Sequence, residues 1–320
     1  MTAIRLLRVT TALAGVLLLS ACAPRGDGGA ATPSPRPPST PDASVPSTPA
    51  LPAEGLVVQV AHTGGFVTPE VLAARLPLVS VYADGRVITQ GPQIEIFPPP
   101  ALPNLQVRRV DAGAVPVLVD RALRAGVAET SDLGSPPVAD LPSTRFTVVT
   151  REQTHVREVY ALGAELPPGP PGEGPPDTGP PGGPDSGLSA EQRAARAELR
   201  ELVRTLSDPA SALPAEAVGE IEAYVPETVA GVVTAWTDPQ HELEHRPVPW
   251  PGPPLPGEPL HEGLGLSCVV AGGDQARAVL EAARPASTLT PWVSEDGRRW
   301  SVALRPLLPH EQGCADLLNS

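Results

Sequence analysis

The sequence contains no lysine: all 23 of its basic residues are arginine. A phosphate-binding P-loop, a Schiff-base enzyme and the Ser-x-x-Lys nucleophile of penicillin-binding enzymes each require a lysine side chain. These three classes of protein are therefore excluded. The reliance on arginine, together with abundant alanine, glycine and proline, is typical of a high-GC genome.

Aromatic residues and net positive charge are also scarce. Phe, Trp and Tyr make up 3% of the 320 residues, and the formal net charge is −13. Stacking platforms for single-stranded nucleic acid are built from aromatic side chains. An acidic chain is also repelled by DNA, RNA and anionic membrane surfaces. We therefore expect no nucleic-acid partner, and a core made of Val, Leu and Ala.

Proline is concentrated in three tracts, at 23–54, 166–187 and 247–259. Such tracts have no apolar periodicity and read as extended or irregular segments. The remainder, about 230 residues without the signal segment, is enough for one large core or two small ones. The predicted organisation is a signal segment at 1–21, a linker at 22–54, a first α+β unit at 55–163, a Pro/Gly-rich loop at 164–188, and a helix with a second α+β unit at 189–320.

The first unit is predicted to contain two hairpins and one amphipathic helix. Asp84-Gly85 accepts the positive φ of a tight turn between two strands. Asp111 is placed to cap a helix that ends at Gly126. The strands are expected at 56–60, 78–82, 86–89, 105–110, 145–150 and 155–162, the last two as a hairpin.

The second unit is predicted to contain the same kinds of element, a hairpin and capped helices, in a different order. Ser189 and Gln192 form a capping box that opens an amphipathic helix, and Asp274 is expected to cap another. Asp296-Gly297 predicts a third hairpin. The strands are expected at 228–236, 265–271, 290–294 and 298–304. The fold class is therefore α+β, with short antiparallel hairpins and a few amphipathic helices in two similar small units.

The first 22 residues have the pattern of a secretory signal. Two arginines precede an apolar stretch at 9–19, which is too short to span a membrane. Leu19-Ser20-Ala21-Cys22 resembles the lipobox of bacterial membrane lipoproteins, in which the cysteine thiol receives a diacylglyceryl group. The resemblance implies lipid attachment at Cys22 and a chain held by the lipid bilayer on the extracytoplasmic face of the cell membrane. An ordinary cleaved signal and an uncleaved anchor are the alternatives.

Assigning Cys22 to lipid leaves Cys268 and Cys314 in an oxidising compartment. A disulfide between them is the simplest expectation. Two separate buried thiols are the alternative, because sequence does not show their separation.

His241, Glu242 and His245 match the H-E-x-x-H pattern of zinc metalloproteases. That pattern requires a helix, which would place both imidazoles on one face. Prolines on both sides of these five residues deny them a helix. We interpret the match as chance and expect neither a metal site nor a cofactor.

Other candidate residues have structural interpretations that we favour. His62, beside Thr63-Gly64-Gly65 at a strand end, is read as an ordinary loop residue. Glu129, Asp132 and Asp140 are read as solvated loop residues. The segment 263–268 begins like a dinucleotide-binding fingerprint but ends in Cys where its last glycine belongs.

The four tryptophans lie in the last third of the chain. Trp292 and Trp300 flank a predicted turn, so a cross-strand pair is favoured over a ligand-binding wall. Trp250, among the prolines of 247–259, is expected to be either exposed or docked over the core.

The folded part, with its Tyr82-Ala-Asp-Gly-Arg hairpin and its closing Arg305-Pro-Leu-Leu-Pro, resembles uncharacterised exported lipoproteins of high-GC bacteria. No activity transfers with that resemblance. We expect a membrane-anchored cell-envelope lipoprotein that acts as a non-catalytic binding or scaffold module, with an envelope protein or glycan as partner. A hydrolase acting on envelope material is the alternative, and a solute-binding lipoprotein is the third hypothesis.

Overall fold

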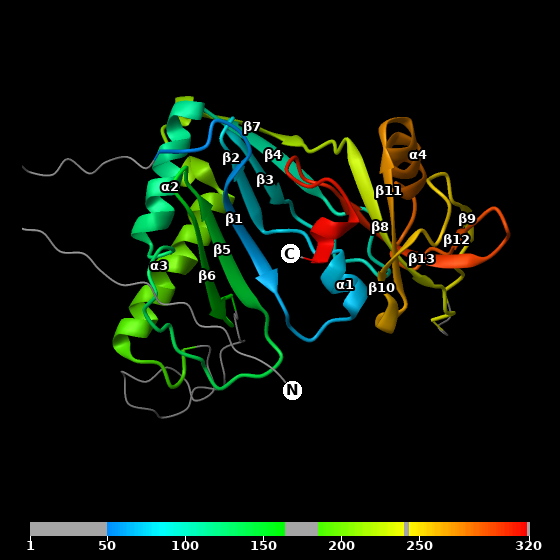
Figure 1. Cartoon of the computed structure of the whole chain (residues 1–320), viewed down its shortest axis with the longest axis horizontal. Coiled ribbons are helices and arrows are strands. Elements are labelled where there is room, and N and C mark those ends of the chain that lie inside the picture. Colours follow the sequence, from blue (N-terminus) through cyan, green and yellow to red (C-terminus); the bar gives the residue numbers. More distant parts are fainter. Residues whose placement is uncertain (1–49, 164–184, 240–242, 319–320) are drawn as a thin grey trace, which may run out of the picture. The chain divides into compact units, whose positions relative to one another are not determined.

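Figure 1 shows a computed structural model that describes residues 50–163, 185–239 and 243–318. The signal segment, Cys22, most of the linker, residues 164–184, and His241 with Glu242 lie outside the described residues. Among the residues described, no helix has the length and apolar character needed to cross a membrane.

The first sheet has seven antiparallel strands in the order β6-β5-β1-β2-β3-β4-β7. These strands are β1 (Leu56–Thr63), β2 (Val79–Tyr82), β3 (Arg86–Gln90), β4 (Leu105–Val110), β5 (Ser143–Val149), β6 (Thr154–Tyr160) and β7 (Val218–Ala223). Buried and less buried residues alternate along β5 because successive side chains point to opposite faces of the sheet.

Two helices, α2 (Val115–Arg124) and α3 (Ala190–Ser207), lie along one face of this sheet (Figure 1). Their apolar residues recur at helical spacing and pack on the strands, with Leu118 and Leu199 fully buried. The resulting core contains valines from β1, β2 and β5, and Phe146. This face is the most heavily covered part of the first sheet.

The second sheet has six strands in the order β10-β11-β8-β13-β12-β9. These strands are β8 (Thr228–Ala235), β9 (Val248–Pro249), β10 (Glu258–His261), β11 (Leu266–Gly272), β12 (Trp292–Val293) and β13 (Arg299–Pro306). β9 and β12 are parallel, and the other pairs are antiparallel.

Both faces of the second sheet are covered. Helix α4 (Gly273–Ala283) packs on one face through Ala276 and Val279. On the other face, the short helix α1 (Pro69–Ala73) contributes Ala73, and the closing 3₁₀ turn η5 (Cys314–Leu318) contributes Leu317. The remaining short 3₁₀ turns are η1 (Ala112–Ala114), η2 (Pro209–Ser211), η3 (Ala215–Ala217) and η4 (Glu262–Leu264).

The α+β class and its antiparallel hairpins are confirmed. β2 pairs with β3 across Asp84-Gly85, β5 with β6, and β12 with β13 across Asp296-Gly297. The capping box of Ser189 is present, with both of its hydrogen bonds. The two sheets differ in strand number and order.

Two predicted helix caps are wrong. Asp111 makes no side-chain capping bond: it precedes η1, and α2 starts after Ala114 with a proline in its first turn. Asp274 lies inside α4, whose N-cap residue is Gly272. Helix α2 starts later than Asp111 indicates, because the 3₁₀ turn η1 comes between them. Helix α4 starts before Asp274, at Gly273.

The predicted boundary between the units also differs from the packing. Helix α3 and strand β7, which the sequence assigned to the second unit, both belong with the first sheet. The Pro/Gly-rich tract does not separate the two sheets, because the chain returns to the first sheet after it.

The tract at 247–259 has a defined structure despite its prolines. It contains β9 and the start of β10, and Leu255 is buried in the second core. Trp250 is docked over that core: its ring meets the ring of Trp292 edge-on at a centroid distance of 5.3 Å, and its Nε1 donates to the Pro253 carbonyl at 2.7 Å. The Trp250 ring thus packs this proline tract against the second sheet.

Candidate functional site

The apolar stripe under α3 ends in a pair of polar residues. On the helix-covered face, β1 presents Val58 and Val60, opposite Val148 and Phe146 of β5. One step further along both strands, His62 lies opposite Thr144. Because side chains on one face recur every second residue, this polar pair occupies the next position of the core stripe.

His62 and Thr144 line a pocket of about 240 Å³ between the sheet and α3. Its remaining walls combine three apolar side chains, a glycine and two arginines: Leu78, Leu162, Val203, Gly163, Arg200 and Arg204. Thr144 is 2% exposed, so the pocket borders a residue that is almost fully buried. A Cβ added to Gly163 would lie 3.8 Å from Nε2 of His62, so the chain passes close to the imidazole.

Arginine side chains frame the pocket. Arg200 donates from Nε to the Leu162 carbonyl at 3.0 Å and from Nη2 to Asp185 at 2.6 Å. Arg204 is paired with Glu201 along α3. These contacts fix the two guanidinium groups over the pocket.

Arg75 contacts the backbone at the end of β1, beside His62. Its Nη1 donates to the Gly64 carbonyl at 2.8 Å and lies 3.5 Å from the His62 carbonyl oxygen. Burial, and secondly the charge of Arg75, lower the pKa of His62 below its usual value. The imidazole of His62 is therefore neutral at pH 7.

Neither side chain of the pair makes a hydrogen bond to another residue that the structure describes. The ring nitrogens of His62 and the hydroxyl of Thr144 are therefore available to water or to a molecule that enters the pocket.

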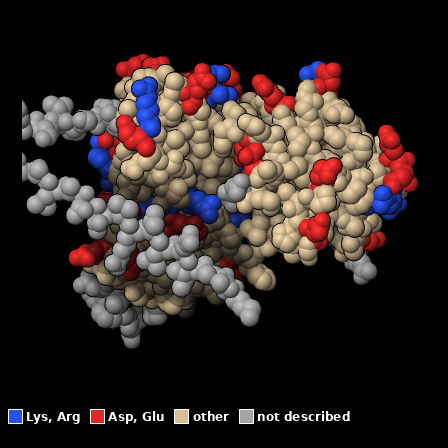
Figure 2. Space-filling model, in the orientation of Figure 1, with Lys and Arg blue, Asp and Glu red and all other residues tan. Residues whose placement is uncertain are grey.

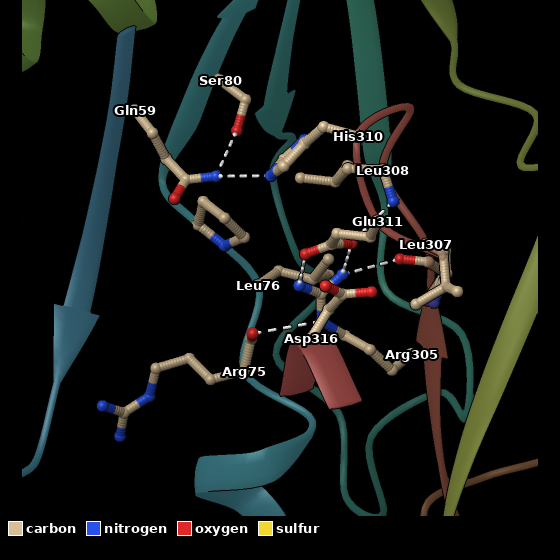
Figure 3. Close-up of polar contacts among 12 residues, drawn as sticks. Gln59, Arg75, Leu76, Ser80, Arg305, Leu307, Leu308, His310, Glu311 and Asp316 are labelled. Atoms are coloured by element: carbon tan, nitrogen blue, oxygen red, sulfur yellow. Dashed lines mark hydrogen bonds and ion pairs between the residues drawn. The ribbon is translucent and has the colours of Figure 1, made fainter. Parts of the chain in front are cut away.

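A second polar cluster lies where the closing segment of the chain meets the first sheet (Figure 3). Arg305 donates from both terminal nitrogens to Glu311, at 3.0 and 2.6 Å, and from Nε to the Arg75 carbonyl at 3.1 Å. Glu311 also accepts the backbone N–H of Leu308 at 2.7 Å. These groups satisfy one another, so this cluster fixes the segment in place.

His310 extends the cluster to β1 and β2. Its Nε2 lies 3.5 Å from the amide nitrogen of Gln59, which also donates to Ser80 at 3.2 Å. Its Nδ1 lies 2.8 Å from the Tyr82 hydroxyl. Because an amide N–H of Gln59 is a donor, the neutral ring carries its proton on Nδ1 and donates it to Tyr82. Figure 3 shows Gln59 turned toward both Ser80 and His310.

The cysteines after residue 22 form the expected bridge. Cys268 on β11 and Cys314 in η5 are joined by a disulfide, with their Cα atoms 6.1 Å apart. The bond ties the closing segment, with His310 and Glu311, to the second sheet.

The H-E-x-x-H match is only partly visible. His241 and Glu242 lie outside the described residues, and residues 243–247, which include His245, are not helical. Within the ranges that the structure describes, no group of three or more His, Cys, Asp or Glu side chains is placed to hold a metal ion.

The acidic residues after α2 make local contacts. Asp132 accepts the backbone N–H of Gly134 at 2.8 Å and the side-chain amide of Gln192 at 3.2 Å. The Glu129 carboxylate lies 3.7 Å from Arg157. The backbone carbonyl of Asp140 accepts the N–H of Phe66 at 3.1 Å. They serve the packing of the segment that precedes β5.

Trp292 and Trp300 are opposite one another in the β12–β13 register, as predicted. The ring partner of Trp292 is Trp250, however, and Trp300 instead donates to the Ser294 hydroxyl at 3.0 Å. Trp236 lies beside Arg299, whose guanidinium carbon is 5.5 Å from the ring centroid. The tryptophans thus stabilise the second sheet and its proline tract.

Comparison of the chain with protein-family models, curated proteins and solved structures gives no match. On the face shown in Figure 2, acidic and basic side chains are scattered among neutral residues.

The interpretation of His62 as an ordinary loop residue is wrong, because His62 lies within β1, and the sequence interpretation does not include Thr144 of β5. The alternation Val58-Val60-His62 and Thr144-Phe146-Val148 is the signal that places both residues on an apolar face. The pairing of β1 with β5 then brings them together.

Proposed function

We propose that this protein is a lipid-anchored binding module of the cell envelope, held on the extracytoplasmic face of the membrane through acylated Cys22. Leu19-Ser20-Ala21-Cys22 supports the anchor. The observation that carries the binding role is the polar pair His62 and Thr144, which lies in a pocket and has no partner among the described residues.

The fold suits a scaffold that presents this pocket. The disulfide and the Arg305–Glu311 pair hold the closing segment against both sheets. Lipid attachment by two or more acyl chains gives stable membrane association, because each buried CH₂ contributes about 0.8 kcal/mol. The linker then separates the module from the bilayer surface.

A binding role is better supported than the alternative of an envelope-directed hydrolase. A threonine nucleophile requires a hydrogen bond to a neighbouring base. Within the described part of the chain, no hydrogen bond joins the Thr144 hydroxyl to the His62 ring, although the two residues are opposite in register.

The anchor is tested by Cys22→Ser in cells that export the full chain. We expect the variant to move from the membrane fraction to the soluble fraction, and to lose the mass of the attached lipid. The matched control is Cys268→Ser with Cys314→Ser, which removes the disulfide and keeps Cys22. Retention of Cys22→Ser in the membrane fraction contradicts the proposal.

A further inference from the structure

We infer that the pocket of His62 and Thr144 binds a small aliphatic carboxylate, with its apolar chain inside the pocket and its carboxylate against these two residues and Arg200. This assigns a ligand class to the binding module proposed above and rests on that proposal. Three features of the pocket carry the inference: its donors, its charge and its size.

Each polar group that remains available in the pocket can donate a hydrogen bond, and His62 and Thr144 can also accept one. A neutral imidazole offers one N–H, and a threonine hydroxyl offers one O–H. Arg200 uses Nε and Nη2 within the protein, and no described residue accepts from its Nη1. A carboxylate accepts several such hydrogen bonds at once, and bonds to a charged acceptor are the stronger kind.

The charge around the pocket is positive, although the chain as a whole is acidic. Arg200 and Arg204 line the pocket, and each is paired with a carboxylate, Asp185 and Glu201 respectively. Two further arginines lie next to these groups outside the lining: Arg75 beside the His62 carbonyl and Arg196 beside Asp185. Asp185 is shared, because it lies 2.6 Å from Arg200 and 3.9 Å from Arg196. Arg196 is fully buried, and its Nε has no hydrogen-bond partner. The surplus of positive charge favours an anionic ligand over a neutral or cationic one.

The pocket also has an apolar side. Leu78, Leu162 and Val203 line it, and burying a hydrocarbon chain against them is favourable. The pocket has a volume of about 240 Å³, which suits a short aliphatic chain rather than a large ligand. We therefore choose hexanoate as the probe.

The inference is tested with four probes that separate charge from apolar chain. Hexanoate, 1-hexanol, hexylamine and acetate are titrated at pH 7 into the mature chain, residues 22–320, which carries Cys22→Ser in place of the lipidated cysteine. Binding is followed by NMR chemical-shift changes. We expect hexanoate to bind at least tenfold more tightly than each of the other three. Equal binding of hexanol or hexylamine overturns the anionic class, and equal binding of acetate overturns the apolar part.

The site is tested with two pairs of matched variants. Thr144→Val keeps the shape of the side chain and removes its donor. Thr147→Val makes the same change three residues further along β5, where the side chain points to the opposite face of the sheet. His62→Phe is matched with His155→Phe at the far end of the β1–β5–β6 register. We expect Thr144→Val and His62→Phe to weaken hexanoate binding about tenfold or more, which is the effect of losing a hydrogen bond to a charged group.

The same loss in both members of a pair, or in neither, overturns the assignment. Circular dichroism of each variant shows whether that variant is folded. If His62→Phe is unfolded, Thr144→Val and its control still test the site. Membrane release by Cys22→Ser without hexanoate binding removes the ligand class and leaves the anchor standing. Hexanoate binding without membrane release contradicts the anchor and leaves the ligand class standing.

Discussion

Arg305 and Glu311 form a salt bridge that is closed to solvent on both sides: the side chains are 0% and 5% exposed, and the shortest N–O distance is 2.6 Å. Arg305 stands near the end of β13 and reaches the carbonyl of Arg75, which follows α1. One side chain thus contacts the closing segment and the connection between β1 and β2.

Breaking this pair should strongly destabilise the fold. Glu311→Gln leaves the guanidinium of Arg305 buried without a counter-charge, so we expect the free energy of unfolding to fall by about 3–5 kcal/mol. Urea denaturation measures the change. The control is Glu201→Gln, which breaks the exposed pair with Arg204 and should cost less than about 1 kcal/mol. Similar losses in the two variants would show that Arg305 is solvated.

The disulfide should contribute to stability through the loop that it closes. Cys268 and Cys314 are 46 residues apart, and a loop of this length lowers the entropy of the unfolded chain by an amount worth about 4 kcal/mol at 25 °C. We expect Cys268→Ala with Cys314→Ala to unfold at a lower urea concentration by a corresponding amount. Reductant should destabilise the unaltered protein and leave the double variant unchanged. An intact mass that does not rise by two hydrogens on reduction contradicts the bridge.

Acid should destabilise the protein through His310. Burial, and to a smaller extent the charge of Arg305, lower the pKa of His310, while Glu311 and Asp316 oppose the shift. The unfolded chain then takes up a proton at this residue near pH 6.5 while the folded chain does not. Stability is therefore lost as the pH falls below about 6.5, down to the lowered pKa of the folded state.

The measurement is the free energy of unfolding at several pH values between 7 and 5. His310→Gln keeps a polar side chain beside Tyr82 and removes the titrating group, so its stability should fall less steeply over this range. Parallel curves for the variant and the unaltered chain would assign the acid sensitivity to other groups, such as His62, whose pKa is lowered in the same direction.

Local sequence patterns predicted the hairpins and the capping box because each depends on neighbouring residues. The pairing of His62 with Thr144 could not be read in this way, since 82 positions separate them. Alternation shows which face of a strand is buried, but it does not name the partner strand. The same reason explains why the sequence does not place β7 in the first sheet. This strand comes from the second half of the chain and pairs with β4. Packing of an aromatic ring, rather than backbone preference, orders the proline tract around Trp250.

The two Asp-Gly turns have the same sequence signal but different surroundings in the fold. Gly85 and Gly297 have nearly equal φ angles, +87° and +81°, so alanine meets the same backbone penalty at both, about 1–2 kcal/mol. A Cβ at Gly297 has no atom within 4 Å, whereas a Cβ at Gly85 would overlap the carbonyl oxygen of Val110. That oxygen belongs to the backbone of β4, so no side-chain rotation can relieve the overlap.

We therefore expect Gly297→Ala to lower the melting temperature by only the amount that its φ angle explains. Gly85→Ala should lower it at least twice as far, because β4 must move away from the β2–β3 hairpin. Differential scanning calorimetry of the two variants decides the matter. Equal shifts in melting temperature would mean that β4 moves away from Gly85 at little cost. The φ angle of the turn glycine would then explain the effect of alanine at both positions.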